Sequence, residues 1–362
     1  MHNHGGLQLA LSSREGLGYA TPRMAGATPR FGITFLPNAP AEFVEWARAS
    51  DAAGFDRIGI ADSQSLYRDV YVCATLCAGA TRRVHFGPRV INPLTRHPAV
   101  AACAAATLDE LAPGRTFLGI GSGDSATYNL GLGAATHQQI RAYVRAIREL
   151  WTTGETIYEG RRSVLTWARP MHVPIFLAAS GPRTLRLAGE IADGVVINTG
   201  LEPEIIRDSI DRVHAGAAAA GRDPASVELW WLPLCHVRDS REEALREISM
   251  SLASAGSHLA RFTTDGKHIP ADVLPAVREL ARRYHFDAHD QPGGGNAGLV
   301  DELGLRDYLA ERFAIAGTPA ECIRKIERVV AAGASNLWMS VHFDDKVAFI
   351  RRWAREVMPA FA

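Results

Sequence analysis

The sequence predicts an α/β fold of the (β/α)8 barrel type, and three observations support this. Short apolar segments typical of buried strands alternate with helical segments along most of the chain. Eight such strands can be counted, whereas the alternative, a doubly wound open sheet, usually has about five or six. The 362 residues are 47% hydrophobic and carry no internal repeat, so one large barrel domain fits the length.

In the first half, we expect strands at residues 31–36, 57–61, 84–91 and 116–120. Helices are expected at residues 40–53, 69–80, 98–111 and 138–153. Gly54 is typical of a helix end. Pro98 fits the first turn of the third helix, and Pro113-Gly114 stops that helix.

Residues 84–125 are the stretch around which the chain is organised, because two neighbouring strands there end in unusual residues. Asn92-Pro93 breaks the first strand, since proline lacks the N–H that a central strand needs. The second strand runs into the glycine-rich turn GSGDS at residues 121–125. Because the C-terminal ends of strands carry the chemistry in α/β folds, we expect the functional site here.

In the second half, strands are expected at residues 174–178, 194–197, 227–237 and 336–341, and helices at residues 180–190, 203–220, 318–332 and 345–357. The alternation is interrupted by an insertion at about residues 240–316. It contains two expected helices, 241–255 and 270–284, followed by an irregular segment, HFDAHDQPGGGN, at residues 285–296. An insertion after a barrel strand lies on the catalytic face, so we interpret it as a lid with a mobile tip at residues 292–295.

Composition narrows the class of protein. The formal net charge is zero, which does not favour a nucleic-acid or membrane partner. The five cysteines form no metal-binding pattern and are typical of small buried side chains in a reducing, cytoplasmic compartment. Residues 1–30 do not resemble a secretory signal, and we expect them to form an extended or disordered arm ahead of a single domain at 31–362.

Two loops are candidates for binding a phosphate-bearing cofactor. The first, ASGPR at residues 179–183, follows a strand and opens a helix, where free N–H groups and the helix dipole favour an anion. The second is the glycine-rich turn at residues 121–125. Either loop alone is as well explained as a plain connection, and neither is a complete dinucleotide-binding fingerprint.

Candidates for catalysis are Asp62, at the end of the second strand, and His97, at the start of the third helix. Each has an equally good structural explanation, because aspartate caps turns and a histidine at a helix start is commonly structural. His285 and His289 are four residues apart, but the glycines that follow indicate a loop, so we expect no metal site. No nucleophile elbow or phosphate-binding P-loop pattern is present, which does not favour hydrolases or NTPases.

Several short blocks stand out along the chain: AAGFD at 52–56, NPLTRHP at 92–98, TLDEL at 107–111, GR at 114–115, GIGSGDS at 119–125, AASGPRTL at 178–185 and AGEIADG at 188–194. In this order and spacing, they resemble the bacterial luciferase-like superfamily of flavin-dependent oxidoreductases, and within it the branch containing methylenetetrahydromethanopterin reductase. The resemblance covers residues 31–200 and implies the same barrel, with an insertion after the seventh strand.

The resemblance also implies FMN, or the deazaflavin coenzyme F-420, at the C-terminal face of the barrel. Its phosphate would be held at Ala179, Ser180, Gly181 and Arg183, with help from Ser122, Gly123 and Asp124. The strand end at Arg89, Val90 and Asn92 would lie against the ring, with a cis peptide bond between Arg89 and Val90. Relatives tend to have a small residue where Arg89 stands, so we expect this side chain to need an exit to solvent or an acidic partner, Asp62 or Asp124.

Two further implications concern the substrate side of the site. Relatives often have a histidine directly after the second strand, where this chain has Ser63, so the role of that histidine is vacant or filled elsewhere. In the insertion, we assign His285, His289 and Asn296 to the substrate or lid region.

These observations favour a monooxygenase that uses reduced FMN, delivered by a separate flavin reductase, and oxygen to oxygenate a small organic substrate. The alternative is deazaflavin-dependent hydride transfer to a carbonyl or iminium carbon. A second alternative is a non-catalytic flavin-binding subunit. The resemblance further implies a homodimer or higher homo-oligomer, paired through the second and third helices, where Val72, Leu76, Val100 and Ala104 offer apolar faces.

Overall fold

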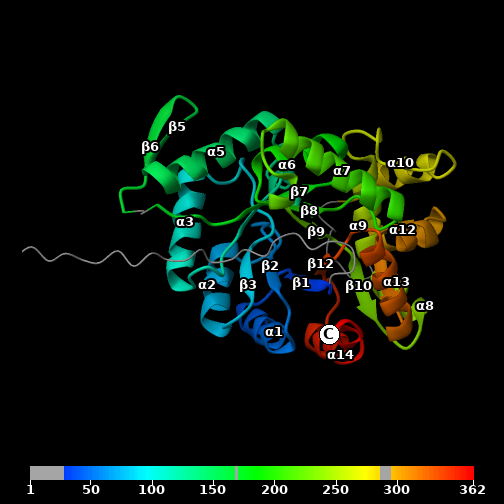
Figure 1. The fold of residues 1–362 in the computed structure, drawn as a ribbon. Helices are drawn as coiled ribbons and strands as arrows, with labels where there is room; N and C mark the ends of the chain where they lie inside the picture. The colour runs from blue at the N-terminus through cyan, green and yellow to red at the C-terminus, as the bar shows by residue number, and fades with distance from the viewer. Residues whose placement is uncertain (1–27, 168–169, 286–294) are drawn as a thin grey trace, which may run out of the picture.

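Eight parallel strands form a barrel at the centre of the structure, a computed structural model that describes residues 28–167, 170–285 and 295–362 (Figure 1). Their order in the sheet is β3-β2-β1-β12-β9-β8-β7-β4. Isolated bridges between Phe86 and Thr116 and between Ile91 and Ile120 join β3 to β4 and close the ring. The strands are β1 (Arg30–Phe35), β2 (Arg57–Ile60), β3 (His85–Pro88), β4 (Leu118–Ile120), β7 (Ile175–Ala179), β8 (Gly194–Ile197), β9 (Glu228–Trp231) and β12 (Asn336–Ser340). The predicted barrel is confirmed.

Helices cover the outside of the barrel, and most begin and end where capping residues in the sequence place them. Gly54 ends the first helix in the left-handed conformation, with φ of 84°. Thr136 and Thr318 each form a capping box with the residue three positions on. The outer helices are α1 (Pro40–Ala53), α2 (Val70–Ala80), α3 (Pro98–Leu111), α5 (His137–Thr153), α6 (Pro182–Ile191), α7 (Pro203–Ala219), α13 (Pro319–Ala331) and α14 (Lys346–Glu356); short turns are α4 (Ser125–Tyr128), η1 (Pro224–Ser226) and η2 (Met358–Phe361).

Two parts of the sheet differ from the sequence-based expectation. The run expected as one strand at residues 227–237 is two, β9 and β10 (Leu234–Val237), because Pro233 interrupts it. β10 pairs in parallel with β11 (Ala314–Gly317), which was not predicted. A hairpin of β5 (Glu155–Tyr158) and β6 (Arg161–Val164) was also not predicted. Its turn, Glu159-Gly160, has positive φ at both residues, as tight hairpins require.

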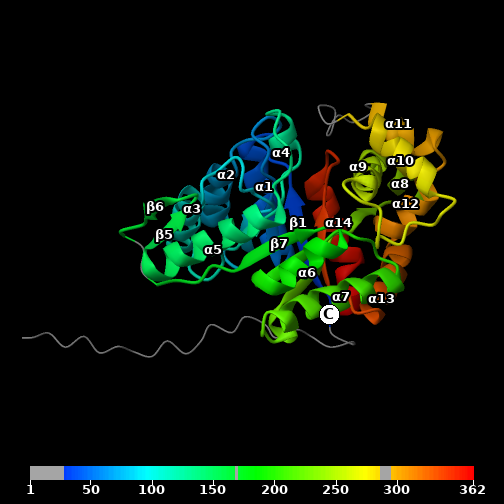
Figure 2. The ribbon, with the colours of Figure 1, turned by 90° about the horizontal axis from the view of Figure 1, so that it is seen from above.

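In its described residues, the insertion after β10 contains five helices: α8 (Arg241–Glu247), α9 (Ser249–Ala260), α10 (Leu274–Arg283), α11 (Gly295–Glu302) and α12 (Arg306–Phe313). Its first helix was expected to run unbroken over residues 241–255, but it divides at Ile248. The last two helices were not predicted. Figures 1 and 2 place the insertion on the side of the barrel opposite the β5–β6 hairpin, with α9 on its inner side. The expected arm, within residues 1–27, and most of the expected mobile tip, at 292–294, lie outside the described residues.

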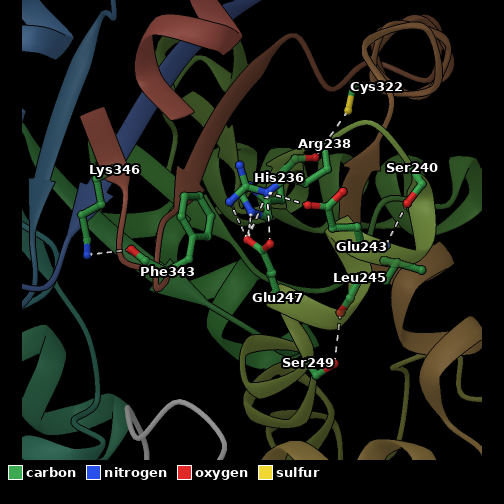
Figure 3. Close-up of polar contacts among 10 residues, drawn as sticks. All are labelled: His236, Arg238, Ser240, Glu243, Leu245, Glu247, Ser249, Cys322, Phe343 and Lys346. Carbon is green, nitrogen blue, oxygen red and sulfur yellow. Dashed lines mark hydrogen bonds and ion pairs between the residues drawn. The ribbon is translucent and has the colours of Figure 1, made fainter. Parts of the chain in front are cut away.

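A buried histidine ties the insertion to the barrel (Figure 3). His236 of β10 lies with Nε2 2.6 Å from Oε2 of Glu247 on α8, and Arg238 donates to the same carboxylate. The ring of Phe343, after β12, stacks on His236 with centroids 3.8 Å apart. Burial lowers the pKa of His236, although Glu247 favours its charged form. α8 is therefore anchored to β10 at the start of the insertion.

The N-terminal end of the barrel is filled by aromatic rings and one buried ion pair. Phe117, Phe176, Trp230 and Trp338 form a cluster inside the ring of strands. The Arg57 guanidinium lies 4.7 Å from the centre of the Phe176 ring and 5.1 Å from that of Trp230. Glu228 accepts from Arg57 at 2.7 Å and also from Arg30. Burial would raise the pKa of Glu228, but the charges of Arg57 and Arg30 outweigh it and lower the pKa.

We predict that Glu228→Gln lowers the free energy of unfolding by about 2 kcal/mol at neutral pH, because the buried Arg57 loses its closer carboxylate and keeps, among the described carboxylates, only Asp56, at 3.2 Å. A carboxyl with a lowered pKa stabilises the fold above its unfolded pKa of about 4.3, and this contribution is lost as the pH falls through the lower folded value. The stability difference between the two proteins should therefore narrow below about pH 4.3, in urea denaturation measured at several pH values.

A matched control is Glu155→Gln, which breaks the exposed pair with Arg162 on the hairpin. It should change stability by less than about 0.5 kcal/mol. Equal effects of the two substitutions would contradict a special role for Glu228.

Candidate active site

A cavity of about 270 Å³ opens at the C-terminal ends of the barrel strands. Its wall is built from the residues that follow β1, β2, β3, β4, β7, β8 and β12, together with one face of α9 from the insertion. This is the end of the barrel at which the sequence predicted the functional site. Of the predicted residues, those that line the cavity are Asp62, Arg89, Val90, Asn92, Ser122, Gly123, Asp124, Ala179 and Ser180.

The end of β3 bulges into the cavity. The peptide bond between Arg89 and Val90 is cis, which confirms the prediction. Val90 packs so closely on β4 that a Cβ at Gly121 would lie 2.6 Å from its Cγ2 atom. A Cβ at Gly119 would lie 2.4 Å from the Pro88 carbonyl oxygen. The two glycines are therefore required by the close approach of the bulge.

Asn92 ends the bulge and turns the chain away from the barrel. Its side-chain oxygen accepts from the N–H groups of Leu94 and Thr95, both at 3.0 Å. This turn is the one that Asn-Pro predicted. The amide nitrogen of Asn92 is then the part of the side chain that remains for a ligand in the cavity.

Arg89 takes neither of the acidic partners that the sequence suggested. Its side chain extends across Gly59 of β2, where a Cβ would lie 3.0 Å from the Arg89 Cβ atom, and Nη2 donates to the Ser340 hydroxyl at 2.7 Å. The guanidinium thus reaches the end of β12. Burial lowers its pKa to about 9, although the half-buried side chain still borders the cavity. The expectation of Asp62 or Asp124 as its partner is wrong.

Asp62 is held by a different arginine. Its side chain is 3% exposed and pairs with Arg96, which also lies 3.2 Å from Asp69 at the start of α2. Burial raises the pKa of Asp62, while the Arg96 charge opposes that shift. The pair joins the loops that follow β2 and β3, and it commits Asp62 to an arginine rather than to a ligand.

Ser63, which stands where relatives often have histidine, is buried against the cavity. Its hydroxyl accepts from the Ser125 hydroxyl at 2.9 Å. Because Ser63 is the acceptor in this bond, its own proton is available to an oxygen atom in the cavity.

His97 does not line the cavity, and the geometry does not support the catalytic role considered for it. Its ring caps α3, with Nδ1 accepting from the Ala99 N–H at 3.2 Å. The ring also packs edge-on against Tyr158 of the hairpin, with centroids 5.3 Å apart. The structural interpretation of a histidine at a helix start therefore applies here.

The glycine-rich turn connects the cavity to the insertion. Gly123 has φ of +98°, which favours glycine. Asp124 accepts from Arg261 at 2.8 Å and lies 3.0 Å from Nε2 of His258, both at the end of α9. Asp124 thus holds α9 over the cavity. The charge of Asp124 is offset by the Arg261 guanidinium.

The N-terminus of α6 lies beside the cavity and suits an anion. Ala179 and Ser180 line the cavity, whereas Gly181 and the exposed Arg183 follow outside its lining. Gly181 is the N-cap, and no side chain caps the helix, so its first N–H groups remain for a ligand. The pKa of His137, which bonds Thr184 at 3.0 Å, is lowered by burial and by the charges of Arg183 and Arg141. This region is therefore electropositive.

Two of the residues assigned to the lid, His285 and Asn296, do not line the cavity. The His285 N–H donates to the Asn296 side-chain oxygen at 3.0 Å, and the Asn296 amide donates back to the His285 carbonyl at 2.8 Å. They hold together the two ends of the segment 286–294, and His289 lies outside the described residues. Among residues 28–167, 170–285 and 295–362, no cluster of His, Cys, Asp and Glu is arranged for a metal, and no helix could span a membrane.

Several cavity residues were not found from the sequence. His258 and Ser251 come from α9, and Ser340 and His342 from the end of β12. They lie far apart in the chain and belong to no recognisable motif, so only the fold brings them together. A histidine directly after the last barrel strand was the one available signal.

Comparison with known proteins agrees with this geometry. The chain belongs to the luciferase-like monooxygenase family, whose model matches residues 16–336. At this level it is an oxidoreductase, and the predicted family is confirmed.

Three relatives refine the comparison. The 5,10-methylenetetrahydromethanopterin reductase of Archaeoglobus fulgidus is 30% identical over 91% of this chain and 99% of its own. An F420-dependent glucose-6-phosphate dehydrogenase of Beutenbergia cavernae is 28% identical over 89% of this chain and 93% of its own. The solved structure of the coenzyme F420-dependent tetrahydromethanopterin reductase of Methanopyrus kandleri superposes with a TM-score of 0.75 at 25% identity, over 93% of this chain and all of that one.

We predict that Asp124→Asn loosens α9, because it removes the carboxylate charge that both His258 and Arg261 contact. Amide hydrogen exchange in residues 249–260 should accelerate by about tenfold, the effect of losing about 1.4 kcal/mol of local stability. As a control, Asp239→Asn breaks an exposed pair with Arg352 and should leave these rates unchanged. Unaltered exchange in the Asp124 variant would show that this contact does not hold the insertion.

Proposed function

We propose that the protein is a deazaflavin-dependent oxidoreductase that transfers a hydride between coenzyme F-420 and the carbonyl or iminium carbon of a small organic substrate. The observation that carries the proposal is the agreement of the three relatives above, which are reductases or dehydrogenases and match at least 89% of this chain. They favour the deazaflavin alternative over the FMN-dependent oxygenation that the sequence alone suggested.

The residues present fit such a coenzyme. The uncapped N-terminus of α6, with Arg183 beside it, offers N–H groups and positive charge to a phosphate. The bulge at Val90, packed directly against Gly121, offers a wall for a ring at the cavity. When bound, a reduced deazaflavin supplies a hydride to an electron-poor carbon.

The chain's own residues would handle the substrate oxygen and its proton. Reduction of a carbonyl places a hydride on carbon and requires a proton on oxygen. The Ser63 hydroxyl, which accepts from Ser125, has its proton available to hydrogen-bond that oxygen. Two of the described histidines line the cavity, and we assign delivery of the proton to His342, because it closely follows the strand end that carries Ser340. Ser63 and His342 would together fill the role of the histidine that Ser63 replaces.

The deciding experiment compares two reactions of the purified protein. Reduced F-420 is mixed, without oxygen, with a panel of aldehydes, ketones and imines, and the return of the oxidised coenzyme's absorbance is followed. In parallel, reduced FMN is supplied with oxygen, and oxygen consumption and product are measured. We expect turnover only in the first arm. Oxygen-dependent product formation only in the second arm would overturn the proposal, and no turnover in either would favour the non-catalytic alternative.

We predict that Ser180→Glu weakens F-420 binding at least tenfold, because it places a carboxylate at the N-terminus of α6 beside the expected phosphate. Ser180→Ala should bind within about threefold of the wild type, since its backbone N–H groups are kept. Ser226→Glu, at an exposed position in η1, controls for added charge. Unchanged affinity in a folded Ser180→Glu protein would remove this loop from the site.

We also propose that the protein forms a homodimer through α2 and α3. Val72 and Val100 are 57% and 58% exposed. From the sequence alone, their apolar character could have been explained by burial inside the barrel, but in the structure they are not buried there. Val72→Glu with Val100→Glu should shift the protein to monomer in sedimentation velocity at micromolar concentration. Leu130→Glu, another exposed apolar side chain, should leave the oligomer intact. A monomeric wild type would contradict this proposal.

A further inference from the structure

The charges that border the cavity are compensated in all but one case among the described residues. Asp62 pairs with Arg96, and Asp124 pairs with His258 and Arg261. Arg89 differs, because none of the described carboxylates lies within ion-pair distance of it and its one hydrogen bond goes to a neutral hydroxyl. A buried cation without a counter-charge costs free energy unless a ligand supplies that charge.

The position of the guanidinium separates it from the expected phosphate site. The Arg89 side chain leaves β3, crosses Gly59 of β2 and ends beside Ser340 of β12. In the sheet, β12 is separated by β9 and β8 from β7, which leads into the phosphate-binding loop at Ser180. An anion at Arg89 is therefore a different group from a phosphate bound at α6.

Polar atoms near Arg89 are also unsatisfied. Its Nε atom and the Thr34 hydroxyl oxygen are both buried without a hydrogen-bond partner in the described chain. Thr34 and Ser340 both line the cavity, and Thr34 adjoins the Arg89 side chain at Gly59. A guanidinium flanked by two hydroxyls is a donor set that matches the oxygen atoms of a carboxylate.

We propose that Arg89 and Ser340, with Thr34 beside them, bind a carboxylate of the substrate. The inference rests on the proposed function, because it names the substrate class as a small carbonyl or imine compound that carries a carboxylate. His342 follows Ser340 by two residues, so the carboxylate site and the proposed proton donor lie at the same strand end. The carboxylate would thus hold the reacting carbon at a fixed distance from that donor.

The test uses pyruvate and 2,3-butanedione, an uncharged compound of nearly the same shape, titrated by calorimetry into the protein without coenzyme. We expect the wild type to bind pyruvate at least tenfold more tightly than butanedione. Arg89→Met should lose this preference. Arg89→Lys should keep part of it, because lysine retains the positive charge, and this result would show that the methionine variant loses the preference through loss of charge and not through misfolding. Arg68→Met, at an exposed position outside the cavity, should bind as the wild type does.

A wild type without preference for pyruvate, or an Arg89→Met protein that retains the preference, would overturn the inference. F-420 affinity measured in the same variants separates the two proposals. Arg89→Met should bind F-420 within about threefold of the wild type, because it keeps Val90 at the ring wall, and both the altered side chain and the phosphate site lie elsewhere. The side chain points toward Gly59 and Ser340, and the phosphate site lies across the barrel. A tenfold loss of F-420 affinity with unchanged pyruvate binding would assign Arg89 to the coenzyme and overturn the inference. If the wild type binds no F-420 while its pyruvate preference depends on Arg89, the proposed function fails and the carboxylate site stands.

Discussion

The close approach of β3 and β4 is the constraint on which the site depends. The barrel closes here through the bridges of Phe86 with Thr116 and Ile91 with Ile120, and between them the chain bulges inward. This is possible because β4 presents Gly119 and Gly121, where a Cβ would collide with the bulge. A side chain at either position would force the strands apart or push the bulge out of the cavity. The same contact therefore closes the barrel and shapes the wall against which a ring would lie.

Ion pairs then fix the loops around that wall. Asp62 and Arg96 join the loops after β2 and β3, and Asp124 fastens α9 to the loop after β4. His236 and Glu247 anchor the first helix of the insertion, α8, to β10. Each of these acidic groups is committed to holding the structure together. The rest of the cavity wall mixes hydroxyls and the guanidinium of Arg89 with apolar side chains such as Leu36 and Leu232.

The barrel, its family and two of the loops that line the cavity could be predicted from the sequence, because they depend on local signals. Strands were marked by apolar runs, and the loops at Gly121 and Ser180 by glycines at strand ends. β11, α11 and α12 were not predicted, because they are short and lie in the stretch after the predicted helix at 270–284, which was interpreted as an irregular part of the insertion. The direction of Arg89 could not be foreseen either, because it depends on the missing side chain of Gly59 in another strand. His258 and His342 meet only through tertiary structure, whereas His97 was prominent in a motif but serves as a helix cap.

The proposal that this cavity binds a deazaflavin is tested most directly by titrating the purified protein with oxidised F-420 and, separately, with FMN, following the fluorescence of each. We expect saturable binding of F-420 at least tenfold tighter than that of FMN, with one coenzyme per chain. Tighter binding of FMN, or no saturable binding of F-420, would contradict it.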